Sequence, residues 1–101
     1  MADAFPERFV FMLKMEGCHY CDVTIENIQA VLRKKKSEPP RFFASTRKQY
    51  QDIERFVNSD ADHDAIKSVG SFPTLFVIAN RKIIKTVRGQ QSVQELASLF
   101  L

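Results

Sequence analysis

The sequence changes its pattern abruptly just before its only two cysteines, Cys18 and Cys21. Residues 8–14 (RFVFMLK) are mostly apolar at odd and even positions alike, which predicts a strand covered on both faces. From residue 19 to about residue 36, apolar side chains recur at helical spacing. A doubly covered strand leading into a helix predicts a sheet with helices packed against it.

The middle of the chain continues this alternation. Pro39-Pro40 end the first helix, and residues 41–45 (RFFAS) predict a short second strand. From residue 46 to about residue 68 the spacing favours a helical region, which the polar residues 58–60 interrupt. Residues 53–58 (IERFVN) also fit a strand, and we leave that alternative open.

The last third of the sequence predicts a hairpin and a final helix. Residues 74–87 contain two apolar runs joined by Asn80-Arg81, which is typical of an antiparallel hairpin. Ser92, with Glu95 three residues later, has the pattern of a capping box at the start of a helix over 92–101.

The predicted order is therefore β-α-β-α-β-β-α, an α/β fold with a mixed four-stranded sheet and helices on both faces. The 101 residues, 45% of them hydrophobic, suffice for one domain over 1–101 with its own packed core. Such a domain does not need a disulfide to hold it together.

The charge and hydropathy of the chain indicate that neither a nucleic acid nor a membrane is its partner. The net charge is only +3, and much of it lies in residues 33–36, where cations complement a helix end. We expect no nucleic-acid partner, because no basic stripe with interleaved aromatic residues is present. We also expect no membrane span, no signal peptide, a cytoplasmic location and a monomer.

Three roles compete for Cys18 and Cys21: a structural disulfide, half of a metal site, or a redox pair. Zinc needs about four ligands, and the only histidine outside this motif, His63, is far along the chain, so we expect no metal site. A structural disulfide would close a very small loop and stabilise little. In a reducing compartment, cysteines are more often catalytic or metal-binding than structural, and the redox pair is favoured.

The predicted position of Cys18 suits a nucleophile. The first turn of a helix has unpaired N–H groups and a partial positive charge, so it lowers the pKa of a thiol below the free value of about 8.5. The thiolate is the attacking species in thiol–disulfide exchange. Cys21, one helical turn deeper, is expected to be shielded and to attack the mixed disulfide formed at Cys18.

The sequence resembles the thioredoxin/glutaredoxin superfamily in three motifs that occur in register. A C-x-x-C follows the first strand, residues 71–74 (SFPT) precede the hairpin where the family has its cis-proline, and Gly89 leads into the last helix. This resemblance covers the whole chain and implies a thioredoxin-like fold. It also implies that Pro73 is cis and lies against the cysteines, and that the backbone of Phe72 pairs with the substrate.

The resemblance does not select one branch of the superfamily. Tyr20 and the nearby Lys14 are similar to glutaredoxin residues, whereas the glutaredoxin Gly-Gly and acidic pair are missing after the hairpin. The thioredoxin tryptophan before the first cysteine and the Gly-Pro between the cysteines are also missing. Where thioredoxins bury an aspartate beneath the second cysteine, this chain has Met12. His19, if protonated, would further favour the thiolate.

The sequence thus predicts a thiol–disulfide oxidoreductase with Cys18 and Cys21 as catalytic residues. Its expected substrates are protein disulfides or glutathione mixed disulfides. We expect no tightly bound cofactor, with glutathione or a reductase as the electron donor. A glutathione-dependent [2Fe–2S] carrier and a non-catalytic interaction module remain alternatives. The expected substrate-binding residues are Lys14, His19, Tyr20, Phe72, Pro73 and Thr74.

Overall fold

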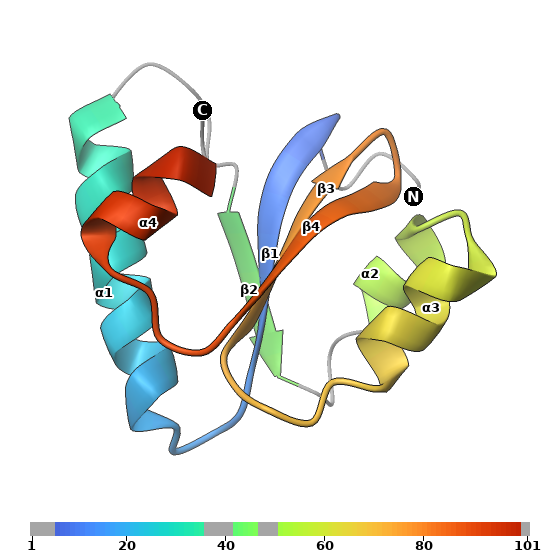
Figure 1. Ribbon diagram of the computed structural model, residues 1–101, viewed down its shortest axis with the longest axis horizontal. Helices are drawn as coiled ribbons and strands as arrows, with labels where there is room; N and C mark the ends of the chain where they lie inside the picture. Colours follow the sequence, from blue (N-terminus) through green and yellow to red (C-terminus); the bar gives the residue numbers. More distant parts are fainter. Residues whose placement is uncertain (1–5, 36–41, 47–50, 100–101) are drawn as a thin grey trace.

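The computed structural model describes residues 6–35, 42–46 and 51–99, and it confirms the predicted α/β order (Figure 1). The predicted helical region consists of two short helices. No helix among the described residues is long and apolar enough to cross a membrane. The elements are β1 (Arg8–Lys14), α1 (His19–Lys35), β2 (Phe42–Thr46), α2 (Gln51–Phe56), α3 (Asp60–Lys67), β3 (Thr74–Ala79), β4 (Lys82–Arg88) and α4 (Val93–Leu99).

The four strands form one mixed sheet in the order β2-β1-β3-β4. β1 runs parallel to β2 and antiparallel to β3, and β3 and β4 form the predicted hairpin. Both residues of its turn have positive φ, 52° at Asn80 and 66° at Arg81. This is the backbone of a type I′ turn, whose twist matches that of the flanking strands.

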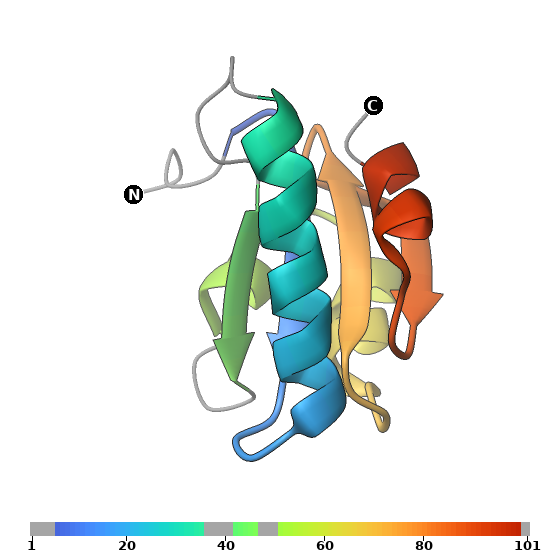
Figure 2. The same ribbon diagram turned by 90° about the vertical axis from the view of Figure 1, so that its left-hand side faces the viewer.

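The unbroken apolar pattern of β1 follows from its central position in the sheet. Val10 and Met12 pack into one core cluster with side chains of α1 and α4. Phe9, Phe11 and Leu13 pack into a second cluster with side chains of α2 and α3. Figures 1 and 2 show these two helix pairs on opposite faces of the sheet, as the sequence predicts.

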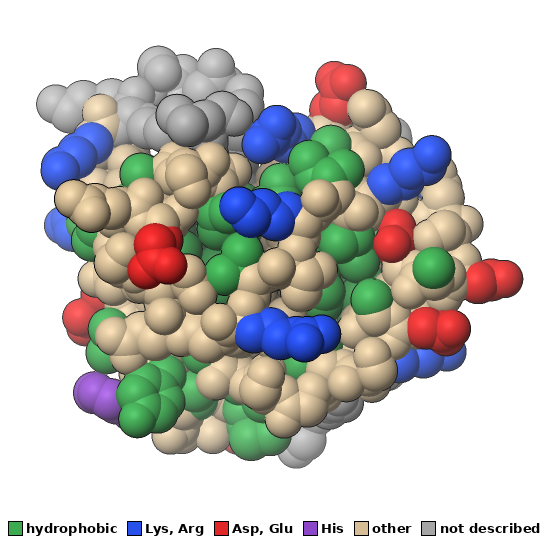
Figure 3. Space-filling view, in the orientation of Figure 1, with side chains coloured by type: hydrophobic (Ala, Val, Ile, Leu, Met, Phe, Trp, Pro, Cys, Tyr) green, Lys and Arg blue, Asp and Glu red, His purple; other side chains and the backbone are tan. Residues whose placement is uncertain are grey.

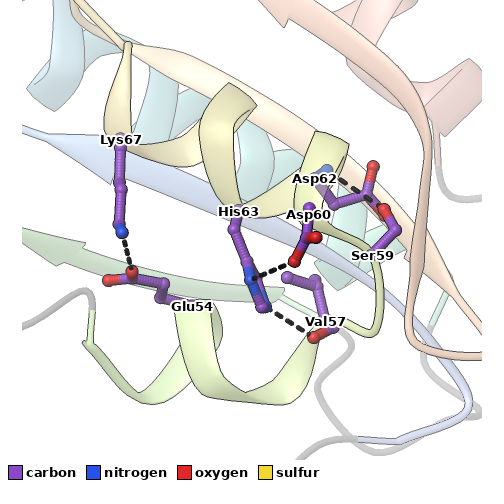
Figure 4. Close-up of polar contacts among 7 residues, drawn as sticks. All are labelled: Glu54, Val57, Ser59, Asp60, Asp62, His63 and Lys67. Atoms are coloured by element: carbon purple, nitrogen blue, oxygen red, sulfur yellow. Dashed lines mark hydrogen bonds and ion pairs between the residues drawn. The ribbon is translucent and has the colours of Figure 1, made fainter.

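Two side chains of α3 contact α2 or the residue just after it (Figure 4). The Nε2 atom of His63 lies 2.9 Å from the carbonyl oxygen of Val57, just after α2. The ammonium group of Lys67 lies 3.1 Å from a carboxylate oxygen of Glu54. The His63 contact orders the link between the helices, while the partly exposed ion pair contributes little free energy.

Asp62 fastens α3 to the hairpin, because its Oδ2 accepts a hydrogen bond of 3.0 Å from the backbone N–H of Ile83. We expect Asp62→Ala to lower the free energy of unfolding by about 1–2 kcal/mol, since it leaves that N–H without its partner. Urea unfolding measures the loss. Asp64→Ala removes the same charge from an exposed position of α3 and should cost less than about 0.5 kcal/mol. Equal losses would contradict the role of the hydrogen bond.

Several predicted boundaries are wrong in the middle of the chain. The second strand (Phe42–Thr46) extends to Thr46 instead of ending at residue 45, and the predicted helix does not begin at Thr46. The reason is strand pairing, because Thr46 lies opposite Lys14 in the parallel ladder with β1. The strand alternative for 53–58 is also wrong, because residues 53–56 belong to α2.

Smaller differences occur at the other ends of elements. The hairpin extends to Arg88, which pairs with Thr74, instead of ending at residue 87. The last helix (Val93–Leu99) begins at Val93, one residue after its N-cap Ser92. The ends predicted for the first and last helices, at residues 36 and 101, and the first residue of the predicted second strand lie outside the described residues.

The predicted capping box at the start of α4 is confirmed. The N–H of Ser92 donates to Oε1 of Glu95 at 3.1 Å, and the N–H of Glu95 donates to the hydroxyl oxygen of Ser92 at 3.2 Å. The hydrogen bond from the Ser92 backbone, followed by that from its side chain, lowers the pKa of the Glu95 carboxyl group below its ordinary value.

This lowered pKa predicts a pH dependence of stability. A carboxyl group whose pKa is lower in the folded chain stabilises the fold above its unfolded pKa. That contribution is lost as the pH falls through the folded value. The stability advantage of the wild type over Glu95→Gln should therefore shrink below about pH 4.5. Thermal unfolding at a series of pH values measures it, and an advantage that is constant down to pH 2 would contradict the capping role.

Candidate active site

The sheet register brings two separate segments to one end of the molecule. Leu13, near the end of β1, pairs with Thr74 at the start of β3. The loop that follows β1 and the segment that precedes β3 therefore leave the sheet at the same end, as Figures 1 and 2 show. The first loop contains Cys18, and the second segment contains the Phe72–Pro73 bond, which is cis as predicted.

A turn at Gly17 places Cys18 directly in front of α1. Gly17 has a φ of +75°, a conformation that costs glycine little and other residues more. The N–H of Cys18 donates to the carbonyl of Met15 across this turn at 3.3 Å. Helix α1 then begins at His19, so Cys18 occupies the N-cap position.

The sulfur of Cys18 acts as the cap of α1. Its Sγ accepts a hydrogen bond of 3.1 Å from the backbone N–H of Cys21, the third residue of the helix. An N-cap oxygen of serine or aspartate makes the same contact in other helices. Because the helix N-terminus also carries a partial positive charge, this position favours a negatively charged sulfur over a neutral one.

The two cysteines differ in accessibility and are joined as a disulfide, with a Cα–Cα distance of 5.2 Å. Cys18 is partly exposed, whereas Cys21 is 0% exposed. Cys21 belongs to the same core cluster as Met12, and Cys18 packs against that cluster. The predicted shielding of Cys21 is confirmed, and a substrate disulfide can approach only Cys18 without disturbing the core.

Exposed side chains flank Cys18 along the chain, on the loop before it and in the first turn of α1. His19 is exposed, Tyr20 is 60% exposed, and the centroids of their rings are 6.0 Å apart. Met15 is also exposed. Met15 and Tyr20 thus form an exposed apolar rim in the residues next to Cys18. A direct contact of His19 or Tyr20 with a substrate stays a prediction.

The segment before β3 is anchored on both sides of the sheet. Phe72 is half-buried and packs against both core clusters. The carbonyl of Pro73 accepts a hydrogen bond of 2.8 Å from the N–H of Gly89. The hydroxyl of Thr74 donates to the carbonyl of Ser71 at 2.7 Å. These bonds give the segment a fixed shape, while its predicted contacts with substrate remain predictions.

Lys14, the other predicted substrate-binding residue, is the last residue of β1. It is half-buried and lies opposite Thr46 of β2, the strand on the side of β1 away from the Pro73 segment. Its predicted role also stays a prediction. Among the described residues, no group of three or more potential metal ligands comes together.

Gln91 stabilises the loop that follows β4, a role that the sequence pattern did not reveal. It is nearly buried, and its amide donates to the carbonyls of Arg88 and Gly89 at 3.1 and 3.2 Å. The backbone carbonyl oxygen of Gln91 accepts a hydrogen bond of 3.0 Å from the side-chain amide of Asn27 in α1. Gln91 thus fixes the loop whose Gly89 holds Pro73. Only tertiary contacts make this glutamine different from its neighbour Gln90.

Comparison with known proteins identifies the fold. No protein-family model and no curated protein matches the sequence. Among solved structures, a thioredoxin-2 described as a component of malaria parasite protein secretion machinery superposes with a TM-score of 0.66, at 15% identity over 92% of this chain and 80% of that one. Fasciola hepatica thioredoxin has a TM-score of 0.64, at 14% identity over 95% and 81%. StoA from Bacillus subtilis has a TM-score of 0.65, at 14% identity over 98% and 86%.

At these identities the similarity establishes the fold alone. The chain has a thioredoxin-like fold, as its three motifs predict, and carries a cysteine pair in C-x-x-C spacing.

Proposed function

We propose that the protein is a thiol–disulfide oxidoreductase in which Cys18 is the nucleophile and Cys21 the resolving cysteine. One observation carries the proposal. The partly exposed sulfur of Cys18 lies at the N-terminus of α1 and accepts the N–H of Cys21, while Cys21 itself is buried behind it. The exposed sulfur thus occupies the position where a thiolate is most stable, and its partner is protected from other thiols.

The proposed reaction transfers two electrons to the substrate. The Cys18 thiolate attacks one sulfur of a substrate disulfide, forms a mixed disulfide and releases the other sulfur as a thiolate, which takes up a proton. The Cys21 thiol loses its proton to solvent, and its thiolate attacks Sγ of Cys18. This step forms the Cys18–Cys21 disulfide and releases the second substrate thiol. A thiol reductant such as glutathione, or a reductase, restores the two thiols.

We further propose protein disulfides or glutathione mixed disulfides as substrates, in a reducing compartment such as the cytoplasm. The exposed rim beside Cys18 supports a peptide-like substrate. The reaction needs no tightly bound cofactor, because sulfur atoms carry the electrons. It needs no second subunit, since both cysteines lie on one chain, one as the N-cap of α1 and the other in its first turn, and we propose a monomer.

The decisive test is a redox titration of the full chain in glutathione buffers, with free thiols trapped at each potential. We expect a reversible conversion of Cys18 and Cys21 between two thiols and one disulfide. A midpoint near about −270 mV would indicate a reductant, and one near about −120 to −180 mV an oxidant or isomerase. If no intramolecular disulfide forms at any potential, the dithiol mechanism is wrong, and the [2Fe–2S] carrier or the interaction module becomes the better hypothesis.

A further inference from the structure

A hollow of about 270 Å³ lies beside the Phe72–Pro73 segment, on the face of the sheet opposite the cysteines. Strands β3 and β4 form its floor, and the end of α3 with the following loop forms its wall. Small-molecule sites start at about 300 Å³, so a hollow of this size suits one side chain of a larger ligand. The lining residues that matter here are Ser68, Ser71, Thr74, Phe76, Thr86 and Arg88.

Arg88 gives this hollow a positive charge. Its side chain is exposed, and no carboxylate of the described residues is within ion-pair distance of it. Figure 3 shows basic side chains across the face on which β4 lies. Lys82 and Lys85 are exposed on the same strand, but they pair with Ala79 and Val77 and so lie on the other face of the sheet. Arg88 is therefore the basic residue in the lining of the hollow. A guanidinium beside the hydroxyl groups of Ser71 and Thr86 is suited to a carboxylate, which it can bind through two parallel hydrogen bonds.

The hollow is coupled to the cysteine site through backbone bonds. Arg88 pairs with Thr74 across the hairpin, and the next residue, Gly89, donates its N–H to the carbonyl of Pro73. Ser71 and Thr74, which line the hollow, flank the Phe72–Pro73 bond on either side. The hollow therefore lies within one or two residues of the Phe72–Pro73 bond along the chain.

We propose that this hollow is a specificity subsite that binds a carboxylate of the substrate close to its reacting cysteine, with Arg88 as the anchoring residue. The inference rests on the proposed oxidoreductase function. Successive side chains of an extended segment point to opposite faces. When the substrate cysteine points to Cys18, a neighbouring side chain points to the other side of the Phe72–Pro73 segment, where the hollow lies. An aspartate or glutamate there would meet Arg88.

The test uses reduced full-length protein and matched peptide disulfides. Each peptide has one cysteine, joined as a mixed disulfide to 2-mercaptoethanol, and carries Glu or Gln at one of the two positions on either side of it. We expect kcat/KM to be about tenfold higher for Glu than for Gln at one position, through KM, as one charge-assisted hydrogen-bond pair allows. Arg88→Gln should abolish this preference. Lys82→Gln, the same charge change at the far end of β4, should keep it.

A second matched pair identifies the source of the carboxylate. The glutathione mixed disulfide of 2-mercaptoethanol is compared with its diethyl ester, which lacks both carboxylates. If only the glutathione disulfide reacts faster than its ester, and this advantage depends on Arg88, the subsite binds a carboxylate of glutathione. If the Glu peptide reacts faster than the Gln peptide, and this advantage depends on Arg88, the subsite binds a protein side chain. Both results support the subsite.

Three results would overturn the inference. One is an equal rate for Glu and Gln peptides and for both glutathione forms, while exchange itself is fast; the oxidoreductase function would then stand without the subsite. The second is an equal loss of preference in Arg88→Gln and Lys82→Gln, which would indicate the general charge of β4. The third is no exchange with any disulfide, in which case the proposed function fails and the subsite with it.

Discussion

Replacement of Cys18 by Ser is expected to abolish disulfide exchange, with a rate loss on the order of 10³-fold or more. A serine hydroxyl at the N-cap can still accept the N–H of Cys21, so α1 keeps its cap. It cannot supply a thiolate or form a disulfide at neutral pH. The reduction of a disulfide-linked fluorescent peptide measures the rate, and circular dichroism checks that the fold is unchanged. Full activity in Cys18→Ser would refute the mechanism.

The matched variant is Cys21→Ser, which should give a different result. Cys18 can still attack, but no buried thiol follows, so the mixed disulfide with the substrate accumulates. Non-reducing electrophoresis and intact mass should show one substrate thiol attached per chain. Glutathione can still release it, which leaves a slower monothiol reaction. If instead Cys21→Ser is inactive without forming an adduct while Cys18→Ser forms one, the two roles are reversed.

The central part of this site could be predicted because local patterns determine it. A strand that is apolar at odd and even positions must be covered on both faces, and the two core clusters on either side of β1 confirm this. The change of period at Gly17 fixes where α1 begins, and therefore places Cys18 at its N-terminus. The capping box of Ser92 and Glu95 is equally local.

Features that depend on distant parts of the chain could not be predicted. Thr46 has neighbours that favour a helix, but its pairing opposite Lys14 keeps it in β2. Gln91 is nearly buried, and the side chain of Asn27, 64 residues earlier, donates a hydrogen bond to its backbone carbonyl. Arg88 lies beside the hollow because it pairs with Thr74 of β3, and because the end of α3 forms the opposite wall. Such positions need the tertiary structure, because nothing in their own segment distinguishes them.

Met12 shows how one side chain sets the surroundings of the buried cysteine. It is 0% exposed and shares an apolar core cluster with Cys21. Thioredoxins bury an aspartate at the position that Met12 resembles. In the reaction proposed above, the Cys21 proton would leave by way of solvent or the substrate, and we expect the second step to be slower than the first attack.

Because Met12 is buried in this apolar cluster, we expect Met12→Asp to be the most destabilising of the substitutions considered. Burial raises the pKa of a carboxyl group by up to 3–5 units, and each unit corresponds to about 1.36 kcal/mol. A rise of about 3 units would thus cost about 4 kcal/mol at pH 7. Chemical unfolding of the oxidised protein measures the loss. Met12→Leu keeps the volume and the apolar character, and it should cost less than about 1.5 kcal/mol.

The pH dependence separates the charge of the new aspartate from its shape. Its pKa would be about 3.9 in the unfolded chain and higher in the folded one, so the folded state binds the proton more tightly. The penalty of Met12→Asp should therefore be smallest below about pH 4 and grow as the pH rises toward the folded pKa. Met12→Asn has nearly the same shape without a charge and should show a penalty that does not vary with pH. If the loss of unfolding free energy varies with pH in the same way for the two variants, water reaches the side chain at position 12. Water would then also have access to the surroundings of the buried cysteine.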